Sequence, residues 1–282
     1  MKKNIIYALA FVLALQVLSS CSKDNEDLTK PITGLGGDTW IAGPLDNWIS
    51  TNFTTPFNIE VKYKWDRSEI AMNKDITPVM ENKVIPVMEA VQKTWIVPYT
   101  AIKGEVFVKK YSHKQFVLVG SPEYNSNGTI TLGTAEGGRK IVLFKLNDFD
   151  KNNKPEVRQM LHTIHHEFAH ILNQNIAFTA DYKRLTPSGY TAVWFNYSDA
   201  TARSLGFITS YARAAPEEDF VEMLSTMLVE GKAGFDALVN SAGAGRPALL
   251  QKQAIVTSYM KNAFGIDVVD LQNRTQTAIN TL

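Results

Sequence analysis

Cysteine is nearly absent from the chain, which excludes one means of stabilising a fold. The one cysteine is Cys21, so no disulfide can form within the chain, and packing or a bound metal must hold the fold. Net charge is nearly absent as well. The formal charge is +1 at pH 7 and falls to −1 when the leader lysines, Lys2 and Lys3, are removed, which argues against a nucleic-acid partner.

Long apolar runs are missing except for one near the N-terminus. Lys2 and Lys3 precede an apolar run at 5–18, which is too short for a membrane-spanning helix but typical of a secretory signal. The run leads into LSSC, which resembles the lipobox of bacterial lipoproteins. That resemblance implies that residues 1–20 are a signal peptide and that Cys21 carries a lipid that anchors the protein to a membrane.

The expected domain boundaries follow the leader and a later change of pattern. Residues 21–37 are polar and acidic and contain Gly and Pro, which predicts a flexible tether. Residues 38–282 are expected to form one folded domain, because a chain with 45% hydrophobic and 20% charged residues is an ordinary globular protein. Within it we expect a subdomain with the sheet and the active-site helix, 38–174, and a helical subdomain, 175–282.

The first half of the folded part mixes strand patterns with one long helical pattern. FNIEVKYKW (57–65) alternates apolar and polar residues like a half-buried strand, and KQFVLVG, GTITLGT and RKIVLFKL are further β-rich runs. The segment 75–95 has apolar residues at helical spacing, and Pro86 is expected to kink it. These patterns predict a small sheet with a helix beside it.

After Asp150 the strand patterns stop and helical patterns continue to the end of the chain. We expect helices at 155–173 and 216–231, a short helix at SDATARSLG, and another over PALLQKQAIVTSYMKNAFG. The predicted fold class is therefore α+β, with a small mixed sheet plus helices in the N-terminal part and a mainly helical C-terminal part.

Histidines are concentrated in one helical segment. Four of the five in the chain lie in HTIHHEFAH (162–170), where His162, His166 and His170 share the face opposite the apolar one. Because His166 and His170 stand at i and i+4, they can bind one metal ion, with Glu167 beside them. This HExxH pattern indicates a metallohydrolase, in which the carboxylate deprotonates a metal-bound water. A chance match on a surface helix is the alternative. We expect His162 to support a ligand or to line the cleft.

A third ligand has to come from another part of the chain. The extended form of the motif, which defines the metzincin class, would need Gly and His where this chain has Asn173 and Ile176. The metzincin class is therefore excluded. No histidine follows His170, which leaves a carboxylate as the third ligand.

The segment PEEDFVEMLSTMLVEG (216–231) supplies the candidate carboxylates. Glu218 and Glu222 lie one helical turn apart, opposite the apolar face, and two stacked carboxylates are readily explained by a nearby cation. A solvated acidic first turn, favoured by the helix dipole, accounts for Glu217 and Asp219.

The same region carries a family resemblance. GFITSYARAAPEEDFVE, following HEFAH, resembles the active-site region of gluzincin-type metallopeptidases related to anthrax lethal factor. It is most similar to the zinc-binding metallopeptidase lipoproteins associated with TonB-dependent nutrient uptake systems of Gram-negative bacteria. The resemblance covers LSSC and roughly residues 160–225, and the sheet region in outline. It implies a zincin-like fold with the active-site cleft between the two subdomains.

The resemblance also implies roles for individual residues. One departure from the pattern is that relatives often carry Asn where this chain has Ala215 and Pro216, which puts the local loop geometry in doubt. The implied roles are zinc ligation by His166, His170 and Glu218, general base catalysis by Glu167, donation of the Tyr211 hydroxyl to the developing oxyanion, and a hydrogen bond from a ligand histidine to Glu222.

The function implied is that of a surface-anchored zinc peptidase acting on extracellular peptides or proteins. The lipid and the acidic tether imply an outer-membrane lipoprotein facing the cell exterior, with a TonB-dependent uptake complex as a partner. One alternative is a non-catalytic accessory lipoprotein that captures ligands for such a complex, but a structural zinc site has no use for Glu167. The other is a metal-capturing lipoprotein using His162 and His165, but three ligands with an adjacent Glu favour an open coordination position.

Overall fold

The structure is a computed structural model, and it describes most of the chain after residue 39. The described residues are 40–66, 68–70, 74–125, 130–131, 133–136 and 139–282. The predicted signal peptide 1–20, the tether 21–37 and the lipidation site Cys21 lie outside the described residues. No helix in the described part has the length and hydropathy needed to cross a membrane.

In the described part of the chain, four short strands form the main sheet. Their order is β1 (Glu60–Lys62), β2 (Gln115–Leu118), β6 (Lys140–Leu143) and β5 (Gly133–Glu136). The pairs β1–β2 and β2–β6 are parallel, whereas β5 and β6 are antiparallel. The two central strands each carry three successive buried apolar residues, as expected for strands covered on both faces. Strands β3 (Glu123–Tyr124) and β4 (Ile130–Thr131) pair separately.

The N-terminal helices differ from the expected pattern in two places. Helix α2 (Pro44–Ile49) continues through a π-helical segment into α3 (Thr55–Phe57), so Phe57 is helical and the predicted strand 57–65 shrinks to β1. The left-handed Asn58, with φ 56°, ends the helix. Helix α4 (Glu81–Val91) continues through a π-helical segment, Gln92–Ile96, into α5 (Val97–Lys103), which is followed by α6 (Glu105–Tyr111). The π-helical segment precedes Pro98, which has no N–H for the regular ladder.

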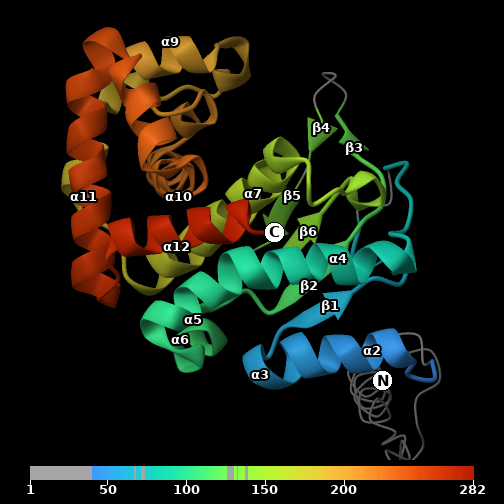
Figure 1. The fold of residues 1–282 in the computed structure, drawn as a ribbon. Helices are drawn as coiled ribbons and strands as arrows, with labels where there is room; N and C mark the ends of the chain where they lie inside the picture. The colour runs from blue at the N-terminus through green and yellow to red at the C-terminus, as the bar shows by residue number, and fades with distance from the viewer. Residues whose placement is uncertain (1–39, 67, 71–73, 126–129, 132, 137–138) are drawn as a thin grey trace, which may run out of the picture. The chain divides into compact units, whose positions relative to one another are not determined.

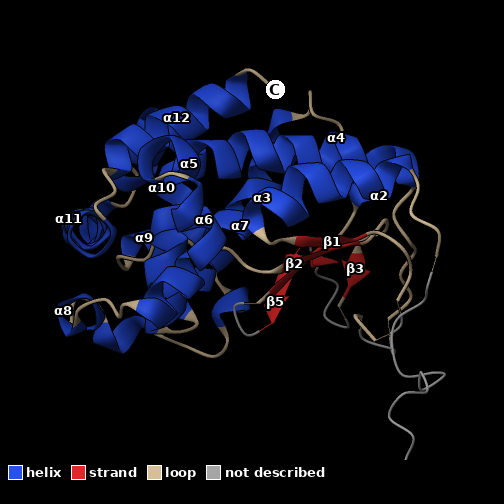
Figure 2. Cartoon of the chain, turned by 90° about the horizontal axis from the view of Figure 1, so that it is seen from below, coloured by secondary structure: helices blue, strands red, loops and turns tan. Residues whose placement is uncertain are grey.

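The C-terminal part is helical, as the sequence predicts. Its helices are α7 (Lys154–Asn175), α8 (Ala180–Lys183), α9 (Asp199–Ser204), α10 (Pro216–Asn240), α11 (Arg246–Phe264) and α12 (Val268–Asn280). The predicted stop at Gly231 is a break with φ 68°, after which α10 continues to Asn240. Figures 1 and 2 show α9, α10 and α11 on one side of the folded unit and the strands on the other. The α+β fold class is confirmed.

Helix α7 connects these two sides. It packs against α10 on one flank and against β5 and β6 on the other. Strand β5 approaches it so closely that a Cβ atom at Gly133 would lie 2.3 Å from Cγ2 of Thr163. Glycine at this position therefore lets the edge strand lie directly beside the histidine helix.

Two of the five histidines belong to the core. His113 is stacked on Trp95, with ring centroids 4.6 Å apart, and meets the edge of Phe116. His165, on the buried face of α7, lies beside Tyr99. Within the described structure, neither imidazole has a hydrogen-bond partner. Burial lowers the pKa of each to about 3, so both are neutral imidazoles near pH 7.

Candidate metal centre

Helix α7 presents the three spaced histidines on one face because its other face is anchored in the core. The side chain of Asn153 caps the start of the helix, and Pro155 lies in the first turn. His166 is buried, whereas His162 and His170 are half-buried. The opposite face is buried and consists of Val157, Leu161, Ile164, Phe168, Ile171 and Leu172.

The first turns of α10 bring two carboxylates to that histidine face. Pro216 starts the helix, and α10 packs closely against α7. Glu218 Oε2 lies 3.0 Å from His166 Nε2 and 3.3 Å from His170 Nε2. Two residues one helical turn apart on α7 therefore meet one carboxylate from α10. The buried apolar face that holds α10 in this position includes Phe220, Met223, Leu224, Met227 and Leu228.

His166, His170 and Glu218 fit the geometry of a zinc site. Each offers one ligand atom, and these atoms all lie within 4.8 Å of one another. Two ligands bound to one tetrahedral zinc at ~2.0–2.1 Å are about 3.3 Å apart, and the two separations in the structure, 3.0 and 3.3 Å, are close to this value. Two imidazoles and a carboxylate are also a donor set that zinc prefers, and three protein ligands leave a position for water.

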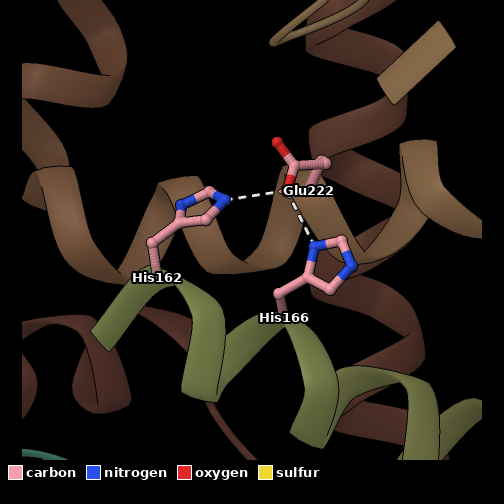
Figure 3. A group of neighbouring side chains, drawn as sticks. All are labelled: His162, His166 and Glu222. Atoms are coloured by element: carbon pink, nitrogen blue, oxygen red, sulfur yellow. Dashed lines mark hydrogen bonds and ion pairs between the residues drawn. The ribbon is translucent and has the colours of Figure 1, made fainter. Parts of the chain in front are cut away.

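Glu222 lies on the other side of the His166 ring (Figure 3). Its Oε1 accepts hydrogen bonds of 2.7 Å from His166 Nδ1 and from His162 Nε2. Its Oε2 accepts one of 2.6 Å from the Thr209 hydroxyl. The bond to Nδ1 orients the ring so that Nε2 faces Glu218, which is how a carboxylate supports a metal-binding histidine.

His162, His166 and Glu222 form a second group whose atoms are close enough for a metal. The separation of 2.7 Å in both of its contacts is the length of a charge-assisted hydrogen bond. Ligands of one tetrahedral zinc would be about 3.3 Å apart. The geometry therefore favours a hydrogen-bonding role for Glu222 and His162.

The opposite charges of the histidines and the carboxylates shift the pKa values of the side chains in this site. Burial works against the charged form of His166, but Glu218 and Glu222 raise its pKa to about 10. Burial also works against ionised Glu218, yet His166 and His170 lower its pKa to about 2. Burial raises the pKa of Glu167. Since a metal-binding imidazole must be unprotonated, zinc binding would displace the proton that these carboxylates hold on His166.

A cleft of about 1050 Å³ opens at this site. Its lining includes the N-terminal half of α7, parts of β4 and β5, and residues of α10, so both predicted subdomains contribute to it. Glu167 and Tyr211 both lie in its wall. Trp194 and Phe195 add an aromatic wall, in which Trp194 meets Tyr211 with ring centroids 4.8 Å apart. A cleft of this size can hold a segment of peptide.

Tyr211 lies close to the proposed ligands. Its ring centroid is 5.7 Å from that of His166. Burial and then the charge of Glu218 raise the pKa of its hydroxyl, so the phenol keeps its proton at neutral pH and can donate it in a hydrogen bond. The turn that carries Tyr211 is fixed by Thr209, whose Oγ1 accepts from the Ala212 N–H at 3.1 Å. Thr209 was not identified from the sequence.

One expectation about the acidic turn was wrong. Glu217 is half exposed and pairs with Lys183, but Asp219 is fully buried rather than solvated. Its Oδ2 lies 2.5 Å from Nζ of Lys252 on α11. The sequence contained a signal for this pair, because Lys252 stands three residues after Leu249 and four before Val256, on the buried stripe of its helix.

Comparison with known proteins finds one family and one solved structure that this chain resembles. The family described as "Putative zinc-binding metallo-peptidase" matches residues 38–269. A crystal structure of a "putative zinc-binding metallo-peptidase" from Bacteroides caccae ATCC 43185 is 31% identical in sequence, with a TM-score of 0.73. The likeness covers 84% of this chain and 91% of the other. No curated protein matches the chain.

These findings confirm two predictions from the sequence. The likeness in fold agrees with the predicted zincin-like class, and the family description agrees with zinc as the cofactor. Because the family match spans most of the chain and the solved relative agrees with it in both sequence and fold, the chain belongs to the family of zinc-binding metallopeptidases that this description names.

Proposed function

We propose that the protein is a zinc-dependent peptidase in which His166, His170 and Glu218 bind the metal. The observation that carries this proposal is the position of one carboxylate oxygen, Glu218 Oε2, at 3.0 and 3.3 Å from the Nε2 atoms of the two histidines. Glu167 stands between these histidines on the same helix and lines the cleft. A site built only for structure or metal capture has no need of this carboxylate.

Each neighbouring residue has a task in peptide hydrolysis. When bound, zinc would polarise the substrate carbonyl and lower the pKa of a water molecule. The Glu167 carboxylate takes a proton from the attacking water and passes it to the leaving amine. The Tyr211 hydroxyl donates a hydrogen bond to the oxygen on which negative charge develops. Glu222 holds the His166 ring in the orientation that ligation needs.

Zinc analysis of the full-length protein tests the ligand set. We expect about one zinc per chain in the wild type, and a strong loss of zinc in the Glu218→Ala variant. Glu217→Ala is the matched control, because Glu217 is the neighbouring carboxylate but pairs with the exposed Lys183, and it should keep its zinc. Cleavage of a peptide library should stop with a chelator and return with zinc. A folded wild type that takes up no zinc would rule out the proposal.

Surface anchoring through the lipid is a separate part of the proposal. The support for it is the sequence of the leader, in which a basic start and an apolar run precede LSSC. A lipid on Cys21 would hold the peptidase on the outer membrane, facing outward, where a TonB-dependent uptake complex could use its products. In cells fed labelled palmitate, the wild type should become labelled and the Cys21→Ser variant should not. Equal labelling of the two proteins would contradict this assignment.

A further inference from the structure

A charged pair lies deep in the core behind the metal centre. Lys252 on α11 and Asp219 on α10 are both 0% exposed, and Nζ lies 2.5 Å from Oδ2. Removing two charges from water is costly, and well-packed apolar residues in their place are often as stable or more so. A gain in stability alone is therefore a weak explanation for this pair.

Further polar contacts hold the pair in one arrangement. Tyr182 donates to the Asp219 carboxylate at 3.2 Å and Tyr190 donates to it at 3.0 Å. Lys252 also donates to the backbone carbonyl of Gly206 at 2.7 Å. The carboxylate and the ammonium are thus fixed by groups from several separate segments of the chain.

The two segments joined by Lys252 carry the proposed ligand Glu218 and the proposed oxyanion donor Tyr211. Asp219 directly follows Glu218 in the first turn of α10, and the segment that starts at Gly206 leads to Tyr211. Gly206 has φ 87°, and a Cβ atom there would lie 2.8 Å from that of Ala248 on α11. The start of the Tyr211 segment is therefore held directly against α11.

The first turn of α10 begins without a side-chain cap in the described structure, where its N-cap residue is Ala215. Successive helical residues point about 100° apart, so Asp219 faces the core while Glu218 faces the histidines. A rotation of this turn would move both side chains together, and fixing Asp219 fixes the direction of Glu218.

We propose that Lys252 and Asp219 are positioning residues of the metal centre. Their contact fixes the orientation of the first turn of α10, so that Glu218 points toward His166 and His170. This inference rests on the proposed ligand set. It assigns the pair a role in metal affinity that is separate from its contribution to stability.

The double variant Asp219→Asn/Lys252→Met separates these two roles. Lys252→Met alone leaves a buried carboxylate without its cation and should lower the Tm of the chelator-treated protein strongly. Removing both charges should return the Tm close to the wild-type value. Zinc affinity, measured by competition with a chromophoric chelator, should nevertheless remain about tenfold weaker than in the wild type.

Gln272→Met is the matched control for a disturbed core around α10. Gln272 is buried and donates to the carbonyl of Met227, about two and a half helical turns beyond Glu218. Its loss should lower the Tm and leave zinc affinity unchanged. A milder second variant, Tyr190→Phe, removes one donor from Asp219 and should weaken zinc binding about fivefold.

The outcomes distinguish this inference from the proposed function. Wild-type zinc affinity in both the double variant and Tyr190→Phe would show that the pair only stabilises the fold, which overturns the inference. If the double variant does not fold, Tyr190→Phe decides in the same way. If Glu218→Ala binds zinc as tightly as the wild type, the ligand set itself is wrong, and the proposed function fails first.

Discussion

Replacing Glu167 by Gln is expected to lower kcat for peptide hydrolysis by about 10²- to 10⁴-fold, the usual contribution of a general base. This corresponds to about 3–5 kcal/mol of transition-state stabilisation. The amide has nearly the shape of the carboxylate but cannot accept the proton of the attacking water. Glu167 is not among the proposed ligands, which are His166, His170 and Glu218, so zinc should stay bound with an affinity close to that of the wild type.

The measurement combines peptide turnover with zinc titration on the same protein samples. Glu156→Gln is the matched control, because Glu156 lies on the same helix and in the same cleft wall but pairs with Lys145 at 2.7 Å. It should keep kcat within about twofold, as a substitution that touches no reacting atom does. If Glu167→Gln retains zinc and wild-type turnover, the base is another group. If it also loses zinc, Glu167 acts on the metal site.

The periodicity of the sequence was sufficient to predict the histidine half of the site. His166 and His170 are close because residues at i and i+4 share a helical face, and this is a local property that no tertiary contact has to supply. The carboxylate half depends on how α10 docks against α7. Excluding a third histidine and comparing with a known family led to Glu218, but spacing alone had left Glu218 and Glu222 as equals.

Helical patterns indicate only half of the polar core behind the site, because they place Lys252 on the buried stripe of α11 but do not place Asp219 in the core. Asp219 follows two acidic neighbours at a helix start, where a solvated turn is the ordinary outcome. Its burial depends on the cation of Lys252 in α11, which lies 33 residues later in the sequence. The π-helical segment Gln92–Ile96 and the short β1 were missed for a related reason, since backbone hydrogen bonding and pairing partners decide such boundaries rather than apolar spacing.

The buried imidazole of His113 is expected to make the folded protein sensitive to acid. Burial, with a smaller contribution from Lys114, lowers its pKa to about 3, whereas in an unfolded chain the pKa of His is about 6.5. Between these values the unfolded state binds a proton that the folded state does not. The stability due to neutral His113 is therefore present above pH 6.5 and is lost as pH falls toward 3, by about 1.4 kcal/mol per pH unit.

Replacing His113 by Phe should remove this dependence without removing a hydrogen bond, because neither ring nitrogen has a partner in the described structure. The phenyl ring can keep the stacking on Trp95. We expect the free energy of unfolding in urea to fall less steeply for the variant, so that the difference between the two proteins grows by about 2 kcal/mol from pH 6.5 to pH 4.5.

The comparison isolates one group because His165 and the carboxylates titrate alike in both proteins. Both should be measured with a chelator present, so that protonation of the metal ligands cancels as well. A difference between the proteins that does not change with pH would mean that the imidazole of His113 reaches water or a partner in solution, and that its ring is not sealed in the aromatic core. A difference that grows toward low pH, in contrast, assigns this part of the acid sensitivity to the His113 imidazole packed between Trp95 and Phe116.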